Sequence, residues 1–242
     1  MIELIKNRNL IFSIGFIATI LVLVVPIPPF ILDICLSFNI AMALAILLVT
    51  IFIREKSEFS TFPAILLLVT LIRFILNLCS MRAILCRHGA QIEIIKALGQ
   101  SVIGNNYILG IIIFSLLMVI QYLVITGNAD RVAEVAERFT LDDMPKKQIA
   151  ISVDLNTDII TNDEAMQLQK QLHKEADFLE SMEGATKFVK GETMAGIFIV
   201  YINIVGGMIS GIVLHGDHLI DATETYTLLT VGAGLVSQLP AM

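Results

Sequence analysis

Residues 31–53 read ILDICLSFNIAMALAILLVTIFI, an apolar run in which Asp33 is the only charged residue. Such a run is long enough to cross the hydrocarbon core of a bilayer as a helix, which takes about 20 apolar residues. Comparable stretches occur at residues 9–26, 61–80, 106–126, 194–214 and 224–242. The sequence therefore predicts an all-α integral membrane protein with about six transmembrane helices.

The composition of the whole chain agrees with a membrane protein. Of 242 residues, 56% are hydrophobic and 16% are charged, and the mean hydropathy is +0.84, whereas about 25% of the residues of soluble domains are charged. The net charge of −6 argues against nucleic acid as a partner, because nucleic acid requires a basic face. Cys35, Cys79 and Cys86 lack metal-ligand spacing, and no nucleophile–base pair or phosphate-binding loop occurs. We therefore expect no metal, no cofactor and no enzyme activity.

The predicted spans divide the chain into three parts. Residues 1–126 hold transmembrane helices one to four, residues 127–191 form a small helical segment outside the membrane, and residues 192–242 hold helices five and six. Most of the 16 Lys and Arg residues lie in loops on the side of the N-terminus, and only Arg82, Arg87 and Lys96 lie in loops on the other side. The positive-inside rule then places the N-terminus and residues 127–191 in the cytoplasm.

Residues 127–191 carry a local pattern of their own. Apolar and charged residues alternate at helical spacing from Ala129 to Phe139. Pro145 is expected to break this helix, because proline lacks the backbone N–H that a helix interior needs. We expect residues 149–151 to be extended and a second helix to run from about Asn162 to Met182.

Several polar side chains lie inside the apolar runs, where a charge is costly. Arg73 stands in the middle of the third predicted span and needs an acidic or backbone partner, while Asp33 and Asn77 lie in spans two and three. Lys187 and Glu192 flank the entry to span five. Two interpretations stay open, namely interfacial and interhelical contacts on the one hand and a proton or ion path on the other.

The sixth predicted span has two unusual features. Gly232 and Gly234, followed by Pro240, suggest that this helix is kinked or interrupted. The span also runs directly into Met242, so we expect the chain to be either a fragment of a longer protein or the product of a truncated gene.

Residues 131–148 read RVAEVAERFTLDDMPKKQ and resemble the signature of the FHIPEP family. The family comprises the large export-gate membrane subunits of flagellar and virulence type III secretion systems. Matching stretches follow in the family's order and spacing, among them LIR at 71–73, KFVKGE at 187–192 and NIVGG at 203–207. The signature residues singled out here are Arg131, Glu134, Arg138, Asp142, Pro145, Lys147 and Gln148.

This resemblance implies an export-gate subunit of the bacterial inner membrane that couples the proton-motive force to protein export. It implies a nonameric ring of copies, beside other export-gate membrane subunits. Exported proteins and chaperones would bind a large cytosolic C-terminal domain, which in the family follows two further spans. The resemblance also assigns Arg82, Lys187 and Glu192 to proton coupling, and we expect Lys187 and Glu192 to lie close together. It leaves open whether the system is flagellar or serves virulence.

The sequence departs from the family pattern at several positions. Ala233 stands where an Asp between two glycines is usual, and Glu192 replaces an Asp. Glu137, Lys146 and Ser152 replace the usual Ala, Gly and Asp. One alternative is therefore an assembly scaffold of the same apparatus that has lost proton coupling. Another is a secondary transporter for a small solute, which predicts an inverted repeat that spans one to three and four to six do not show.

Overall fold

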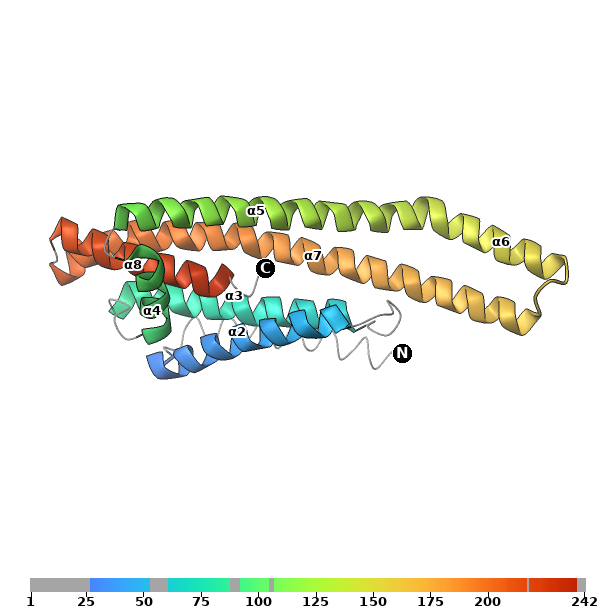
Figure 1. Cartoon of the computed structure of the whole chain (residues 1–242), viewed down its shortest axis with the longest axis horizontal. Coiled ribbons are helices and arrows are strands. Elements are labelled where there is room, and N and C mark those ends of the chain that lie inside the picture. Colours follow the sequence, from blue (N-terminus) through green and yellow to red (C-terminus); the bar gives the residue numbers. More distant parts are fainter. Residues whose placement is uncertain (1–26, 53–60, 88–91, 105–106, 217, 239–242) are drawn as a thin grey trace. The chain divides into compact units, whose positions relative to one another are not determined.

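The computed structural model describes residues 27–52, 61–87, 92–104, 107–216 and 218–238, and these form helices joined by short turns, without a strand (Figure 1). The predicted all-α class is thereby confirmed. The long helices are α2 (Pro29–Phe52), α3 (Phe62–Arg87), α5 (Tyr107–Arg138) and α7 (Asn162–Ser210). The shorter elements are α4 (Glu93–Ile103), α6 (Met144–Asn156), α8 (Leu219–Gln238) and two π-helical turns, η1 (Phe139–Asp143) and η2 (Gly211–His215).

Within the described residues, four stretches are long and apolar enough to cross a membrane, namely Pro29–Phe52, Phe62–Cys86, Gly110–Asn156 and Asn162–Val213. They overlap the predicted spans two to five over most of their length. The first predicted span, residues 9–26, lies outside the described residues. Helix α8 is not among the four, because Asp221, Glu224 and several threonines lower its hydropathy. That α8 crosses the membrane therefore stays a prediction.

The chain divides into two compact units. Of the described residues, those within 27–51, 69–122 and 192–238 form unit 1, and those within 61–68 and 123–191 belong to unit 2. Unit 2 thus contains the segment 127–191 that the sequence predicts to lie outside the membrane. The location of this segment relative to the membrane stays a prediction.

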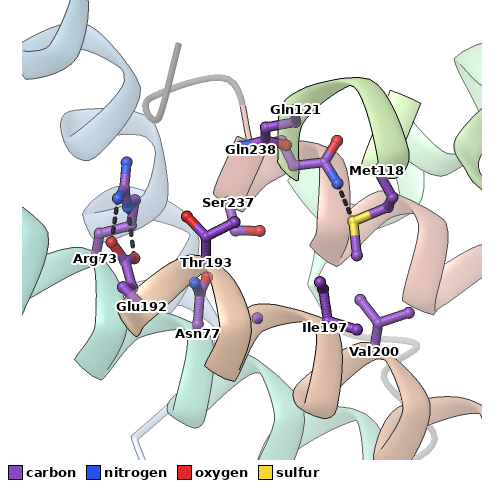
Figure 2. Close-up of a pocket in the computed structure, with 11 residues that line it drawn as sticks. Arg73, Asn77, Met118, Gln121, Glu192, Thr193, Ile197, Val200, Ser237 and Gln238 are labelled. Carbon is purple, nitrogen blue, oxygen red and sulfur yellow. Dashed lines mark hydrogen bonds and ion pairs between the residues drawn. The ribbon is translucent and has the colours of Figure 1, made fainter. Parts of the chain in front are cut away.

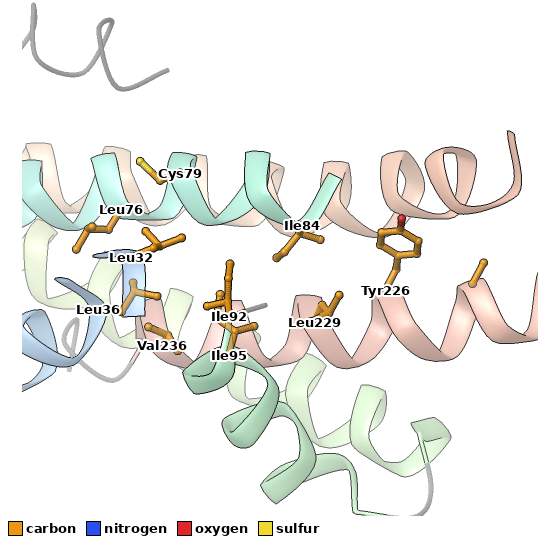
Figure 3. Packing of buried hydrophobic residues seen from close by; sticks show 11 residues of the cluster. Leu32, Leu36, Leu76, Cys79, Ile84, Ile92, Ile95, Tyr226, Leu229 and Val236 are labelled. Carbon is orange, nitrogen blue, oxygen red and sulfur yellow. The ribbon is translucent and has the colours of Figure 1, made fainter. Parts of the chain in front are cut away.

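The core of unit 1 is a cluster of buried apolar side chains from four helices (Figure 3). Helix α2 contributes Leu32 and Leu36, and α3 contributes Leu76, Cys79 and Ile84. On the other side, Ile95 of α4 packs with side chains of α8. Those α8 side chains are Ala222, Tyr226, Leu229 and Val236. Helix α8 is the most thoroughly buried element of this unit, since its middle and end turns are almost wholly covered.

Helices α4 and α8 cross with their backbones in contact. A Cβ atom at Gly99 would overlap the carbonyl oxygen of Leu228, and a Cβ at Gly232 would overlap the carbonyl oxygen of Ile95. Only glycine allows two helix backbones to approach this closely. Helix α8 is continuous through Gly232 and Gly234, so no interruption occurs at these glycines, and Pro240 lies outside the described residues. The glycines serve close packing instead, since a Cβ at Gly234 would collide with the Phe114 ring.

Asp33 of α2 caps the N-terminus of α4. The backbone N–H of Glu93 donates to Asp33 Oδ2 at 3.2 Å, and that of Ile94 donates to Asp33 Oδ1 at 3.2 Å. The residue at the N-cap of α4 is Ile92, which has no side-chain acceptor. The first N–H groups of a helix lack partners within it and favour a negative charge nearby. A carboxylate from another helix therefore supplies what the local sequence lacks.

Replacing Asp33 by Ala is expected to loosen the first turn of α4 and to cost about 1 kcal/mol, which is typical for the loss of an N-cap. The check is amide hydrogen exchange, followed by mass spectrometry on the detergent-solubilised protein. Exchange at Glu93 and Ile94 should accelerate in D33A and less in D33N, which keeps one carbonyl oxygen. Equal protection of these amides in D33A and the unmodified chain would contradict the capping role.

In unit 2 the chain passes from α5 through η1 into α6 without leaving a helical conformation. The predicted break at Pro145 is wrong, because the helix continues from η1 through Pro145 and α6 to Asn156. In the π-helical turn η1, the N–H of Met144 donates to the Phe139 carbonyl, so the backbone stays hydrogen-bonded up to the residue before the proline. The predicted extended stretch at residues 149–151 is also wrong, since these residues lie within α6.

Helix α7 begins at Asn162, as the sequence predicts. A capping box explains the position of this start. The Thr161 N–H donates to Glu164 Oε2 at 2.8 Å, and the Glu164 N–H donates to Thr161 Oγ1 at 3.3 Å. The helix does not end near Met182 as predicted but continues to Ser210.

Candidate functional site

A buried ion pair joins α3 to α7 within unit 1. Arg73 Nε donates to Glu192 Oε1 at 2.6 Å, and Arg73 Nη2 donates to Glu192 Oε2. The two side chains are only 5% and 6% exposed. The pairing is bidentate, which is the strongest arrangement available to a guanidinium and a carboxylate. The sequence predicts that Arg73 needs an acidic or backbone partner, and the structure identifies Glu192 as that partner.

The energetics of this pair differ from those of a surface ion pair. Removing two charges from water costs several kcal/mol per ion, and their attraction repays this only with good geometry. Removing one partner of such a pair costs about 3–5 kcal/mol, because the other charge is then buried alone. Each of the two side chains therefore depends strongly on the other.

A small cavity of about 40 Å³ adjoins the pair (Figure 2). In Figure 2, Arg73 and Glu192 lie on one side of the cavity, and Gln238 and Met118 lie on the other, where the Gln238 amide donates to the Met118 sulfur. The walls come from α3, α5, α7 and α8. The lining residues are Arg73, Asn77, Met118, Gln121, Glu192, Thr193, Gly196, Ile197, Val200, Ser237 and Gln238.

The polar part of this wall follows from helical spacing. Asn77 follows Arg73 by one turn of α3, and Thr193 directly follows Glu192, so α3 and α7 each present two polar groups to the cavity. The carbonyl oxygen Oε1 of Gln121 on α5 is buried and has no hydrogen-bond partner among the described residues. The cavity is thus a polar site inside a unit whose core is otherwise apolar.

Comparison with known families adds to this geometry. The sequence model of the FHIPEP family matches residues 19–242, which is nearly the whole chain. The chain belongs to the FHIPEP family.

Two similar relatives are named as flagellar biosynthesis proteins. The chain is 47% identical over 224 residues to the flagellar biosynthesis protein FlhA of Escherichia coli, covering 91% of this chain and 32% of that protein. It is 44% identical over 237 residues to FlhA of Bacillus subtilis, covering 98% of this chain and 35% of that protein. The chain therefore spans about a third of the length of these relatives. No solved structure matches it significantly.

The FHIPEP resemblance also singles out Lys187 and Arg82, and neither of them is part of the buried ion pair. Lys187 Nζ donates to Glu183 Oε1 at 2.6 Å, one turn earlier on α7, and is largely exposed. Glu192 pairs with Arg73 instead of Lys187. Arg82 lies half-buried near the end of α3. That Arg82, Lys187 and Glu192 act together in coupling stays a prediction.

The FHIPEP signature residues lie on the surface of unit 2. Arg131, Glu134 and Arg138 are exposed on the last turns of α5, Asp142 lies in η1, and Pro145, Lys147 and Gln148 lie in α6. Lys147 has a defined role in packing, because its Nζ pairs with Glu175 Oε2 at 3.0 Å and lies 4.9 Å from the centre of the Phe139 ring. A second ion pair joins Lys190 Nζ to Asp130 Oδ1 at 2.7 Å.

Sequence reasoning misses part of the site. Gln121, Thr193 and Ser237 are not singled out, although a glutamine within the apolar run 106–126 is a signal that could have found Gln121. Ala233, which the FHIPEP resemblance places where an Asp is expected, packs its side chain against the apolar core cluster.

Proposed function

We propose that this FHIPEP chain forms the membrane part of an export-gate subunit of a bacterial protein export apparatus. The relatives named above are flagellar biosynthesis proteins, which favours flagellar export. In this proposal the chain has no enzymatic role and lies in the inner membrane with its N-terminus and unit 2 in the cytoplasm. It forms a ring with copies of itself, beside other membrane subunits of the gate. Exported proteins and chaperones bind the cytosolic domain of the complete gate subunit.

The observation that carries the proposal is the buried pair of Arg73 and Glu192 beside a polar cavity. A buried ion pair is a poor way to gain stability, since apolar side chains of similar volume often stabilise as well or better. Its presence therefore favours a role for the charges themselves. Protonation of Glu192 removes the negative charge that balances Arg73, which weakens the contact between α3 and α7. Uptake and release of a proton then move these two helices relative to each other.

Two further charges lie on the same helices as the pair. Arg82 follows Arg73 on α3, and Lys187 precedes Glu192 on α7. We assign them to the same coupling process as participants outside the buried pair. The cavity of about 40 Å³ is far smaller than the pockets that hold organic ligands.

Replacing Glu192 by Ala in the chromosomal gene is expected to reduce protein export about tenfold or more, which corresponds to about 1.4 kcal/mol or more in the rate-limiting barrier. Glu192→Asp keeps the charge on a shorter arm and should retain part of the export. The measurement is the amount of exported protein in the culture medium, together with native gel electrophoresis of membrane extracts to follow ring assembly.

The matched control is Glu180→Ala, which removes an exposed acidic side chain from the same helix. Export should remain close to normal in E180A. Equal export by E192A and E180A would overturn proton coupling through Glu192.

An assembly scaffold without proton coupling is the second candidate. It is favoured by Ala233, whose methyl group packs against the apolar cluster where an Asp is usual in the family. The same experiment separates the two functions. Normal export by E192A with an intact ring supports the scaffold, whereas lost export with an intact ring supports coupling.

A further inference from the structure

The cavity beside Arg73 and Glu192 has the size and lining of a water site. An internal site for one water needs about 10–15 Å³ and two to four polar partners. A volume of about 40 Å³ thus holds about two or three water molecules. Apolar cavities of this kind stay dry, whereas this one is lined by side chains with hydrogen-bonding groups from all four of its helices.

One group in the wall needs a hydrogen-bond donor. Gln121 is 6% exposed, and its Oε1 accepts no hydrogen bond from any described residue. A buried carbonyl oxygen without a donor costs about 1–3 kcal/mol. Arg73 directs its Nε and Nη2 to Glu192, and no other described group donates to this oxygen. The orphaned oxygen therefore needs a donor from outside the described residues.

Two other groups in the wall can accept from the same donor. The Ser237 hydroxyl donates to the Gly234 carbonyl at 2.8 Å, which leaves its oxygen free to accept. Each Glu192 oxygen accepts one hydrogen bond from Arg73 and, as a carboxylate oxygen, can accept a second. Water can donate two hydrogen bonds at once, so it can link these acceptors, which a single protein N–H cannot.

We propose that this cavity binds water inside the membrane-spanning unit, with Gln121 as the residue that holds the water next to Glu192. A second part of the proposal rests on the proposed function: the same water donates a proton to Glu192 and accepts it back. A hydronium ion in the cavity gives one proton to the carboxylate, which leaves neutral water and a carboxylic acid. In the reverse step the acid returns the proton to water and the ion pair with Arg73 re-forms. Gln121 is a positioning residue in this scheme, because it acts through the water.

Hydration can be tested with a thiol placed in the wall. In a chain in which Cys35, Cys79 and Cys86 are replaced by Ala, S237C puts a thiol at the cavity with little change in size. The thiolate is the reactive form, and it needs water around it. Silver ion, added to membranes that contain the protein, should react with the thiol of S237C at least about tenfold faster than with that of S80C.

Ser80 is the matched control because it is also a buried serine of unit 1, is 3% exposed, and donates to the backbone carbonyl of Leu76 without lining the cavity. Adding Q121M to S237C removes the orphaned oxygen and fills part of the space, so silver labelling should slow about tenfold. Adding Q121N instead should restore part of the rate. The infrared S–H stretching band reports hydrogen bonding of the thiol and does not depend on whether silver can reach it. This band should lie at lower frequency in S237C than in S80C.

Two results would overturn the proposal. One is equal labelling and equal S–H bands for S237C and S80C, and the other is a Q121M variant that labels as fast as its parent while remaining folded. Export measurements on E192A are separate from this outcome. If S237C labels slowly and E192A loses export, proton coupling through Glu192 stands but the water site does not. If S237C labels fast and E192A exports normally, the cavity is hydrated but Glu192 does not couple protons to export.

Discussion

Replacing Gly232 by Leu is expected to prevent α8 from docking on α4. The Cβ of even an alanine would lie 2.8 Å from the carbonyl carbon of Ile95 and overlap its oxygen. Both atoms belong to helix backbone, so neither can rotate away. Overpacking usually costs about 1–3 kcal/mol where side chains can adjust, and more is expected here. The measurement is resistance of the purified protein to protease, together with its yield in detergent.

Gly184→Ala is the matched control for this substitution. Gly184 lies in the interior of α7, and a Cβ there meets nothing within 4 Å. Alanine is favoured over glycine in a helix by about 1 kcal/mol, so G184A should be at least as stable as the unmodified protein. Normal yield and protease resistance of G232L would show that α4 and α8 do not cross at this glycine.

Replacing Arg73 by Met is expected to destabilise the protein by about 3–5 kcal/mol, because Glu192 is then buried without its counter-charge. The double variant R73M/E192M should recover most of this loss, since two apolar side chains can replace a buried ion pair without penalty. Export should nevertheless stay absent in the double variant. A substitution that restores the fold and does not restore export would separate a structural role of the pair from its role in coupling.

Thermal unfolding for this comparison can be followed with a thiol-reactive fluorogenic maleimide. The chain contains no Trp, and Cys79 is 8% exposed, so it becomes reactive when the core opens. Cys86 is exposed and is replaced by Ser in all variants to lower the background. Equal unfolding temperatures for R73M and R73M/E192M would contradict the energetic coupling of the two charges.

The sequence was sufficient to predict the helical class and the positions of most long helices. Apolar length is a local property, and the predicted span 31–53 therefore falls within two residues of α2 at each end. The capping box at Thr161 and Glu164 is equally local, and the start of α7 was predicted correctly. Pro145 was misread because a proline in a first helical turn and a proline that breaks a helix look alike without the neighbouring turn.

The site itself depends on pairings that are distant in sequence. The demand of Arg73 for a partner could be predicted from the cost of a charge in lipid, but the identity of that partner could not, because Glu192 is 119 residues away. The cap that Asp33 provides for α4 and the backbone contact at Gly232 likewise involve separate helices. Periodicity reports which face of a helix is apolar, but it does not report which helix covers that face.

The capping of α4 by Asp33 also implies an order of events during biosynthesis. Helix α2 leaves the ribosome before α4, so the carboxylate is already in place when the unsatisfied N–H groups of Glu93 and Ile94 emerge. Helix α8, which covers the Gly99 face of α4, is made after α5, α6 and α7. During synthesis the N-terminus of α4 is therefore already capped by α2, while the face around Gly99 is not yet covered by α8. A pause in translation between these two helices would leave that face open to chaperones or to wrong neighbours for its whole duration.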